Sequence, residues 1–211
     1  MKKKLYGNTS GLRNIQIKEL ENLYIFSTPP ECIAIQELAA SLVKMSHEIR
    51  RQIGLLIDRS GKVIYVIIGE PRKIVIPVTS GYMALPGKLK GLRLIHTHLK
   101  DEPLTRDDLT DLALLRLDYI TAVCISQDGK PGIIYSAHIL PGENSDPYQI
   151  LEPATIQDLN MDCLVQILAL ESELTKKNSL YKPESGRETA FLINAKTSSP
   201  RDAYSSIEEL K

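Results

Sequence analysis

Apolar residues recur at helical spacing in two parts of the chain. In each part they return at steps of three and four positions, while polar side chains fill the opposite face. This spacing is typical of an amphipathic helix with one face against a core. The sequence therefore predicts two such helices, one with Ile35, Leu38, Leu42, Met45 and Ile49 on its apolar face and the other with Leu159, Cys163, Ile167, Leu170 and Leu174.

Runs of β-branched residues on either side of short glycine-containing turns predict two hairpins. The turns are Asp58–Gly61, which offers a glycine where a positive φ is needed, and Asp128–Gly132. The paired strands are Ile53–Ile57 with Val63–Ile68, and Tyr119–Ser126 with Ile133–Leu140.

The segment between the two hairpins contains further predicted elements. Lys73–Pro77 is compatible with a third strand, whereas Val78–Lys90 is rich in glycine and proline, as long loops are. Gly91–His96 is an apolar run of the kind found in buried strands, and it leads into a pair of histidines. Leucines at helical spacing after Thr105 predict another helix.

Strands flank helices throughout the first part of the chain, and this order predicts a three-layer α/β domain with a mixed sheet. Pro141–Pro147 is rich in turn-forming residues and marks the expected edge of that domain. We therefore expect an amino-terminal segment at residues 1–29, the α/β domain at 30–145, a helix and linker at 146–187, and the start of another unit at 188–211.

Composition narrows the choice of partners and compartment. The 26 lysines and arginines equal the 26 aspartates and glutamates, which excludes the broad positive surface of a DNA-binding protein, so any RNA contact has to be local. No apolar run approaches the roughly 18 residues of a membrane span, and we expect a cytoplasmic protein. The cysteines are odd in number and widely spaced, which indicates free thiols.

The chain has no P-loop. In the motif Gly-x-x-x-x-Gly-Lys-Ser/Thr, backbone amides cradle the phosphates of a nucleotide. Gly-Lys pairs such as those at Gly61 and Gly87 lack both the spaced first glycine and the hydroxyl residue. These residues therefore cannot hydrolyse GTP by the usual route.

The segment after the central predicted strand contains the candidate chemistry. His96 and His98 are one residue apart at the strand end, so both imidazoles can turn toward one point, and Asp108 in the first turn of the next helix can approach it. Two nitrogens and one carboxylate oxygen are the ligand set of a catalytic zinc with an open fourth position. Such an ion lowers the pKa of bound water toward about 7. A nearby carboxylate is still needed as general base.

Structural roles account for the same residues. Thr105 and Asp108 match the Ser/Thr-x-x-Asp pattern of a helix cap, a role that is compatible with metal ligation. His96 and His98 alternatively form a hydrogen-bonded structural pair or the remains of a lost site. The sequence leaves these alternatives open.

The order of these residues resembles the motif of JAMM metalloproteases and the related RadC proteins, in which His-x-His-Pro is followed by a serine and an aspartate. The resemblance puts His96, His98 and Asp108 in the ligand positions, with Thr105 in place of the serine. It implies a fold like that of JAMM proteins and cytidine deaminases. Leu99 stands in place of the proline, and the gap from His98 to Thr105 is one residue shorter.

The JAMM motif also has an upstream glutamate. Where that residue should begin the first strand, this chain has Arg50, Arg51 and Gln52. Glu48, one turn earlier in the predicted helix, is the nearest substitute and the catalytic candidate. These departures favour a relationship of fold over peptidase activity.

A longer stretch is similar to the extension found ahead of some bacterial HflX GTPases. It includes Gly91–Leu99 and Glu102–Asp118, and the similarity covers most of residues 8–150. Residues 188–211 look like the entry into the general amino-terminal domain of that family. The resemblance implies a full-length protein that binds GTP and Mg²⁺ downstream of Lys211 and acts on the large ribosomal subunit.

Three functions follow from these observations. A regulatory or interaction module that docks on the large ribosomal subunit or on its own GTPase domain is favoured. The alternative is a zinc-dependent peptidase or isopeptidase that uses His96, His98 and Asp108. A nucleotide-binding module without a P-loop is a third, and only the fold class supports it.

Overall fold

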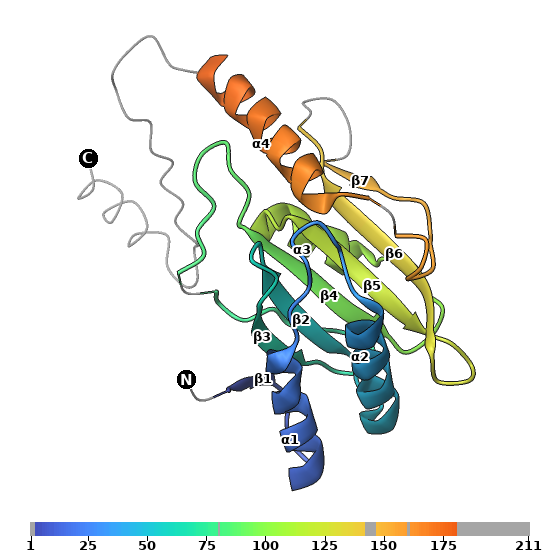
Figure 1. Cartoon of the computed structure of the whole chain (residues 1–211). Coiled ribbons are helices and arrows are strands. Elements are labelled where there is room, and N and C mark those ends of the chain that lie inside the picture. Colours follow the sequence, from blue (N-terminus) through green and yellow to red (C-terminus); the bar gives the residue numbers. More distant parts are fainter. Residues whose placement is uncertain (1–2, 80, 142–146, 160, 181–211) are drawn as a thin grey trace, which may run out of the picture. The chain divides into compact units, whose positions relative to one another are not determined.

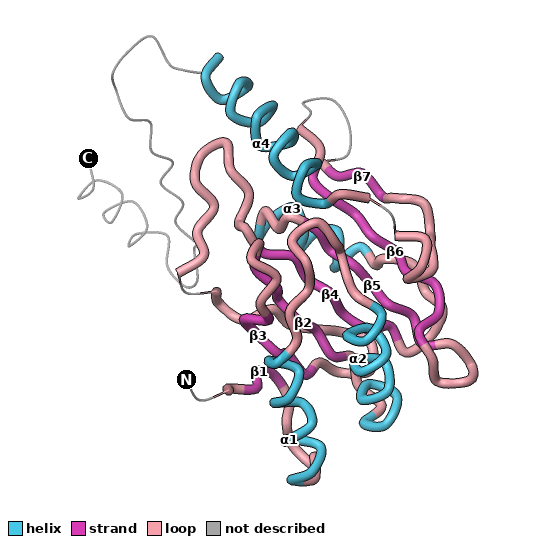
Figure 2. Tube along the Cα trace, viewed as in Figure 1, coloured by secondary structure: helices cyan, strands magenta, loops and turns pink. Residues whose placement is uncertain are grey.

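A mixed seven-stranded sheet forms the centre of the protein, with the strand order β1-β3-β2-β4-β5-β6-β7 (Figures 1 and 2). The computed structural model describes residues 3–79, 81–141, 147–159 and 161–180. The strands are β1 (Leu5–Gly7), β2 (Ile53–Asp58), β3 (Val63–Ile68), β4 (Leu92–His98), β5 (Tyr119–Ile125), β6 (Pro131–Ile139) and β7 (Tyr148–Ile150).

Helices lie on both faces of this sheet, with α2 and α4 on one face and α3 on the other (Figure 1). The α/β class and the mixed sheet expected from the sequence are confirmed. None of the helices in the described ranges combines the length and apolar character needed to cross a bilayer. The helices are α1 (Asn14–Asn22), the 3-10 helix η1 (Leu23–Ile25), α2 (Gln36–Ile49), α3 (Arg106–Leu115) and α4 (Cys163–Leu180).

The central strand β4 has three strands on each side. It runs antiparallel to β2 and parallel to β5, and every residue of β4 and β5 is buried. Both predicted hairpins are confirmed, since β2 pairs antiparallel with β3 and β5 pairs antiparallel with β6. The site residues carried by β4 are therefore held in the buried centre of the sheet.

The apolar stripe predicted for the first helix is the buried face of α2. Leu38 and Leu42 are fully buried and Met45 is nearly so. Burying each such side chain contributes about 1.5–3 kcal/mol. In α4, Cys163 and Ile167 are buried, again as the spacing predicts. The helix begins at Cys163, however, so Leu159, which was predicted on the same helical face, lies ahead of it.

The third strand considered for Lys73–Pro77 does not form, and this part of the chain is irregular. The reason is that β3, the nearest strand, already pairs with β2 on one side and with β1 on the other. A tight turn, in which the amide of Glu70 donates to the carbonyl of Lys73 at 2.7 Å, begins the irregular segment. Ile74 is buried all the same, so the segment covers the core without joining the sheet.

The sheet extends on both sides beyond the α/β range expected at residues 30–145. β1 comes from the amino-terminal segment and pairs parallel with β3, and β7 comes from the segment after that range and pairs antiparallel with β6. The helix predicted in the 146–187 segment is α4. The rest of the predicted linker, at 181–187, and the predicted start of another unit at 188–211 lie outside the described residues.

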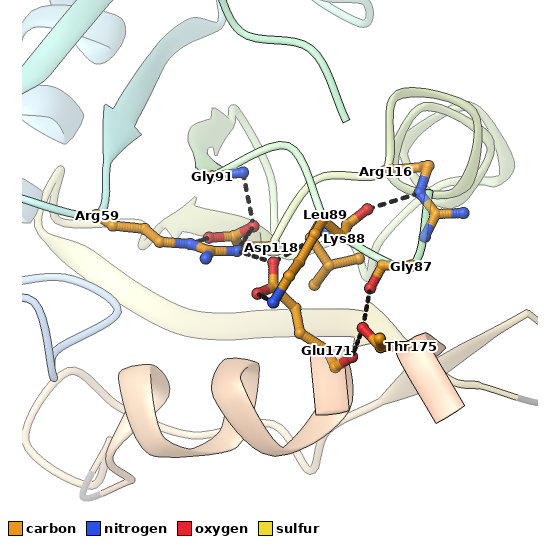
Figure 3. A network of polar contacts seen from close by, with 9 residues as sticks. All are labelled: Arg59, Gly87, Lys88, Leu89, Gly91, Arg116, Asp118, Glu171 and Thr175. Atoms are coloured by element: carbon orange, nitrogen blue, oxygen red, sulfur yellow. Dashed lines mark hydrogen bonds and ion pairs between the residues drawn. The ribbon is translucent and has the colours of Figure 1, made fainter. Parts of the chain in front are cut away.

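The middle of α4 is attached to the sheet through one buried carboxylate, that of Glu171 (Figure 3). It accepts hydrogen bonds from Arg59 at 2.7 Å, from Lys88 at 3.0 Å and from the backbone amide of Leu89 at 3.0 Å. Arg59 also donates to both carboxylate oxygens of Asp118, at 2.6 and 3.0 Å. Burial acts against the charge of Glu171, but these hydrogen bonds outweigh it and lower its pKa to about 2.

The start of α4 is attached by neutral groups. The amide of Cys163 donates to the carbonyl of Glu31 at 2.9 Å. Three residues later, the Gln166 amide group accepts from the Tyr119 hydroxyl and donates to Nε2 of the buried His138 at 2.8 Å. α4 is therefore held by polar contacts at its start, at Glu171 and at Thr175, whose hydroxyl donates to the carbonyl of Gly87 at 3.3 Å (Figure 3).

Gly61, in the turn of the first hairpin, packs directly against the backbone of Thr28, and a substitution there tests this contact. Gly61 has φ +86°, and a Cβ there would collide with the carbonyl oxygen of Thr28. Gly11 has φ +76° but open space around it. We expect Gly61→Ala to lower the free energy of unfolding by about 3 kcal/mol and Gly11→Ala by only about 1 kcal/mol, since the second variant has the left-handed strain without the collision. Urea unfolding measures both, and equal losses would contradict the role of the collision.

Candidate metal centre

The candidate ligands lie where the central strand faces α3. Side chains alternate between the two faces of a strand, so His96 and His98 project from one face of β4 and Thr97 from the other. Thr97 forms a 2.6 Å hydrogen bond with Ser46 on α2. The histidine pair therefore points away from α2, and both imidazoles turn to the same side, as the spacing of the motif predicts.

Small neighbours on the adjacent strands leave room for the imidazoles. Gly54 lies opposite His96 on β2, and Ala122 lies beside it on β5. A Cβ at position 54 would be 3.6 Å from the Cβ of His96 and would collide with the end of the Ile74 side chain. Sequence reasoning missed Gly54, because a glycine inside an apolar strand gives no functional signal until the strand across from it is known.

The three predicted ligands converge. His96 Nε2 lies 3.0 Å from His98 Nε2 and 3.2 Å from Asp108 Oδ1, and His98 Nε2 lies 3.5 Å from Asp108 Oδ2. The residues are 0%, 2% and 7% exposed, respectively. Within the described ranges, they are the group of histidine, cysteine and acidic side chains that can hold a metal ion.

These separations fit a tetrahedral ion. Metal–ligand bonds of about 2.0–2.1 Å at tetrahedral angles place neighbouring ligand atoms roughly 3.3 Å apart. The 3.0 Å between the two Nε2 atoms and the 3.2 Å from His96 Nε2 to Asp108 Oδ1 lie near that value, whereas the 3.5 Å from His98 Nε2 is measured to the other oxygen, Oδ2. The donor set of two imidazole nitrogens and one carboxylate therefore suits a tetrahedral ion that takes one further ligand.

A backbone carbonyl orients one of the imidazoles. His98 Nδ1 lies 2.9 Å from the carbonyl oxygen of Glu102. A carbonyl can only accept, so Nδ1 carries a proton, and Nε2 is the nitrogen of this ring that is available to a metal ion. Nδ1 of His96 is buried without a hydrogen-bond partner among the described residues. Glu102 was also missed from the sequence, because it acts through its backbone.

The Asp108 carboxylate divides its two oxygens between two tasks. Oδ2 accepts from the backbone amide and the hydroxyl of Thr105, both at 2.7 Å, and the Asp108 amide is bound in return to the Thr105 hydroxyl at 3.2 Å. The helix cap predicted from the sequence is thus confirmed at the start of α3. Because Oδ1 is the oxygen nearest His96, the cap and metal ligation are compatible.

The electrostatics of the site favour a charged carboxylate. Burial alone would raise the pKa of Asp108, but hydrogen bonds with His96 and His98, the charge of His96 and the bond from Thr105 hold it well below its usual range. For His98, burial lowers the pKa, yet the bonds with Asp108 and the Glu102 carbonyl raise it overall. A negative charge in this position attracts a cation.

A second carboxylate lies one turn further along α3. Asp111 is half-buried, and its pKa is raised by burial first and then by the charges of Asp108 and Asp107. Residues three apart on a helix are neighbours on its surface, so the sequence alone could have predicted that Asp111 lies beside Asp108.

The structure places the catalytic candidate Glu48 on α2, where it is bound to α1. Its carboxylate accepts from Arg13 at 2.8 Å and from Gln16 at 3.0 Å. Arg51, in the region where the resemblance calls for a glutamate, donates at 2.8 and 2.9 Å to two backbone carbonyls ahead of α1. Neither side chain belongs to the group formed by the two histidines and Asp108.

Removing the Thr105 hydroxyl tests whether the helix cap also positions the metal ligand. We expect Thr105→Ala to cost about 1 kcal/mol of stability, as a lost cap does, and to weaken zinc affinity by about 10–100-fold, as the loss of a group that orients a ligand does. Thr105→Ser keeps the hydroxyl and should restore both. Competition with a chromophoric chelator measures the affinity, and unchanged affinity in the alanine variant would limit Thr105 to capping.

Comparison with known proteins adds no assignment to this geometry. No protein-family model matches the chain, and no curated protein matches it.

Proposed function

We propose that this chain is a metal-binding interaction module with a JAMM-like fold, and that it forms the amino-terminal regulatory part of an HflX-type ribosome-associated GTP-binding protein. In this proposal, His96, His98 and Asp108 hold a zinc ion that stabilises the domain. The carrying observation is the convergence of these three groups at separations of 3.0–3.5 Å in a nearly closed site.

Zinc is the ion that the donor set favours. Imidazole nitrogen is a common zinc ligand, whereas Mg²⁺ and Ca²⁺ prefer oxygen ligands in larger numbers. The proton on His98 Nδ1 leaves Nε2 free for the ion, and the anchored Asp108 carboxylate supplies a negative charge. Both features are typical of ligands that are held in place before the ion binds.

Two observations favour binding over hydrolysis. His96 and His98 are at most 2% exposed, whereas a catalytic zinc keeps a position open to substrate. A hydrolase also needs a group that moves a proton to or from the attacking water. Glu48 is engaged by Arg13 and Gln16. A zinc ion bound here would supply Lewis-acid chemistry. The burial of the histidines and the engagement of Glu48 argue against the substrate access and the proton transfer that a peptidase also requires.

The ribosome-associated part of the proposal rests on the sequence resemblance over residues 8–150. The chain itself carries no P-loop, so GTP binding would belong to a downstream domain. Its balanced charge favours a local contact with the ribosome or with that domain, because broad attraction to RNA needs an excess of positive charge.

One experiment tests binding and hydrolysis together. The zinc-loaded chain is sedimented with large ribosomal subunits and, separately, mixed with the GTPase domain of an HflX protein. It is also incubated with peptide and isopeptide substrates, with His98→Ala as the zinc-free control. We expect saturable association at micromolar concentrations with at least one partner and no cleavage above the control.

The alternative function, a JAMM-like zinc hydrolase using His96, His98 and Asp108, is supported by the same ligand set. Cleavage that requires zinc and disappears in His98→Ala would establish this alternative and overturn the non-catalytic proposal. Absence of association with both the ribosomal subunit and the GTPase domain would overturn the interaction module, even if zinc is bound.

A further inference from the structure

Two of the three cysteines lie next to each other on the face of the sheet opposite the metal centre. The amide of Cys163, the first residue of α4, donates to the carbonyl of Glu31 at 2.9 Å. Standard bond lengths then limit the Cα atoms of Cys32 and Cys163 to a separation of at most roughly 7 Å. Disulfide-bonded residues usually have Cα atoms about 4.4–6.8 Å apart, and this range lies within the limit that the backbone sets for the pair.

A buried guanidinium completes the cluster. Arg93 Nη2 lies 3.5 Å from the carbonyl oxygen of Pro29, and the amide of Cys32 donates to that same oxygen at 3.0 Å. Arg93 pairs with Tyr119 in the sheet and so shares the face that α4 covers. It is 5% exposed, and its Nε has no hydrogen-bond partner among the described residues.

The positive charge of Arg93 acts on the Cys163 thiol. Burial raises the pKa of Cys163 to about 12, while Arg93 opposes that rise. Burial lowers the pKa of the Arg93 guanidinium, and a thiolate at Cys163 would act against that lowering. A cation beside a thiol favours the thiolate, which is the reactive form in oxidation and in disulfide exchange.

From this geometry we propose that Cys32 and Cys163 are a redox-active pair that forms a reversible disulfide when a hydroperoxide oxidises Cys32. Cys32 is partly exposed and Cys163 is buried, so the oxidant reaches Cys32 first. The bond joins the first residue of α4 to the segment ahead of α2. It is independent of the metal centre and of the proposed partner.

The chemistry balances with hydrogen peroxide as the oxidant. The sulfur of Cys32 attacks one peroxide oxygen, the O–O bond breaks, and a sulfenic acid and one water form. The sulfur of Cys163 then attacks the sulfur of Cys32, the S–O bond breaks, and a second water leaves with the Cys163 proton. The two thiols lose two electrons in all, and these reduce the peroxide to two waters.

Cys124 provides a matched control on the opposite face of the sheet. It is the neighbour of His98 on β5, is buried, and is directed to the Glu102 carbonyl at 3.4 Å. Burial raises its pKa to about 11. Because Cys124 lies on the other face of the sheet from Cys32 and Cys163, it has no cysteine to pair with on its own face and should stay reduced while the other two react.

Mass spectrometry of the whole chain after treatment with hydrogen peroxide tests the proposal. We expect a loss of about 2 Da, the mass of two hydrogens, a peptide pair linked through Cys32 and Cys163, and complete reversal by dithiothreitol. Cys124→Ser should behave identically. Cys163→Ser should leave a Cys32 sulfenic acid that dimedone captures, and Cys32→Ser should form no internal link.

Peptide mapping of the wild-type chain shows which cysteines are linked, so the test does not depend on the folding of the serine variants. A link through Cys124, disulfides between chains only, or oxygen addition at Cys32 without the internal link would each overturn the proposal.

Discussion

Replacing His98 with alanine is expected to remove zinc from the chain. The wild-type protein should bind close to one ion per chain, because its three ligand groups already converge on one point, whereas the variant keeps only two of them. At zinc concentrations about 1,000-fold above the dissociation constant, binding should stabilise the wild-type fold by about 4 kcal/mol. Elemental analysis after gel filtration measures the content, and urea unfolding with and without zinc measures the stabilisation.

His47→Ala is the matched control for this experiment. His47 lies on the exposed side of α2, with its ring beside Gly129. Its replacement should leave both the zinc content and the stabilisation unchanged. Zinc that persists in His98→Ala at the wild-type level would show that the ion binds elsewhere, and the metal centre would then be rejected.

Removing the Glu171 carboxylate is expected to loosen α4. Glu171→Ala leaves the Leu89 amide and the Lys88 ammonium without their acceptor and deprives Arg59 of one of its two carboxylate partners. Breaking a buried charged network by removing one member costs about 3–5 kcal/mol. We expect a loss of about 3 kcal/mol, together with faster hydrogen exchange of the α4 amides that precedes exchange in β4.

The same carboxylate gives α4 a defined pH dependence. Its pKa is lowered from 4.5 to about 2, so its stabilising effect is complete above the unfolded value and is lost as the pH falls through the folded one. Wild-type α4 should therefore loosen between about pH 4.5 and pH 2. The alanine variant should lack this particular transition.

Glu173→Ala is the control for Glu171→Ala, since Glu173 is exposed on the same helix. A surface change of this kind usually alters stability by less than about 0.5 kcal/mol. Similar losses in the two variants would mean that helix propensity, and not the buried network, explains the effect.

Regular local patterns account for the parts of the fold that the sequence predicts well. The stripe through Leu38 and Leu42 identifies α2, because a helix repeats its buried face at that spacing. The turn at Gly61 identifies the first hairpin, because few other residues accept its positive φ. The three candidate ligands could be predicted in the same way, since two histidines one residue apart on a strand must share a face.

Contacts between distant segments account for what the sequence did not reveal. β1 is a three-residue strand whose pairing with β3 leaves no periodic trace, and that pairing also explains why Lys73–Pro77 stays irregular. The proximity of Cys32 to Cys163 likewise depends on where α4 begins against the loop ahead of α2. The spacing of residues along the chain carries no information about such long-range contacts, because only tertiary packing creates them.

Because the Asp108 carboxylate both caps a helix and can bind a metal ion, its conservation in homologues has to be interpreted with care. One of its oxygens serves the start of α3 whether or not an ion is present. Folding alone is therefore enough to preserve this aspartate through evolution, and its retention in a relative says nothing about a metal. Nδ1 of His96 has no hydrogen-bond partner among the described residues, whereas His98 also binds the Glu102 carbonyl. A lineage that no longer binds the ion should therefore show substitution first at position 96, beside an unchanged aspartate.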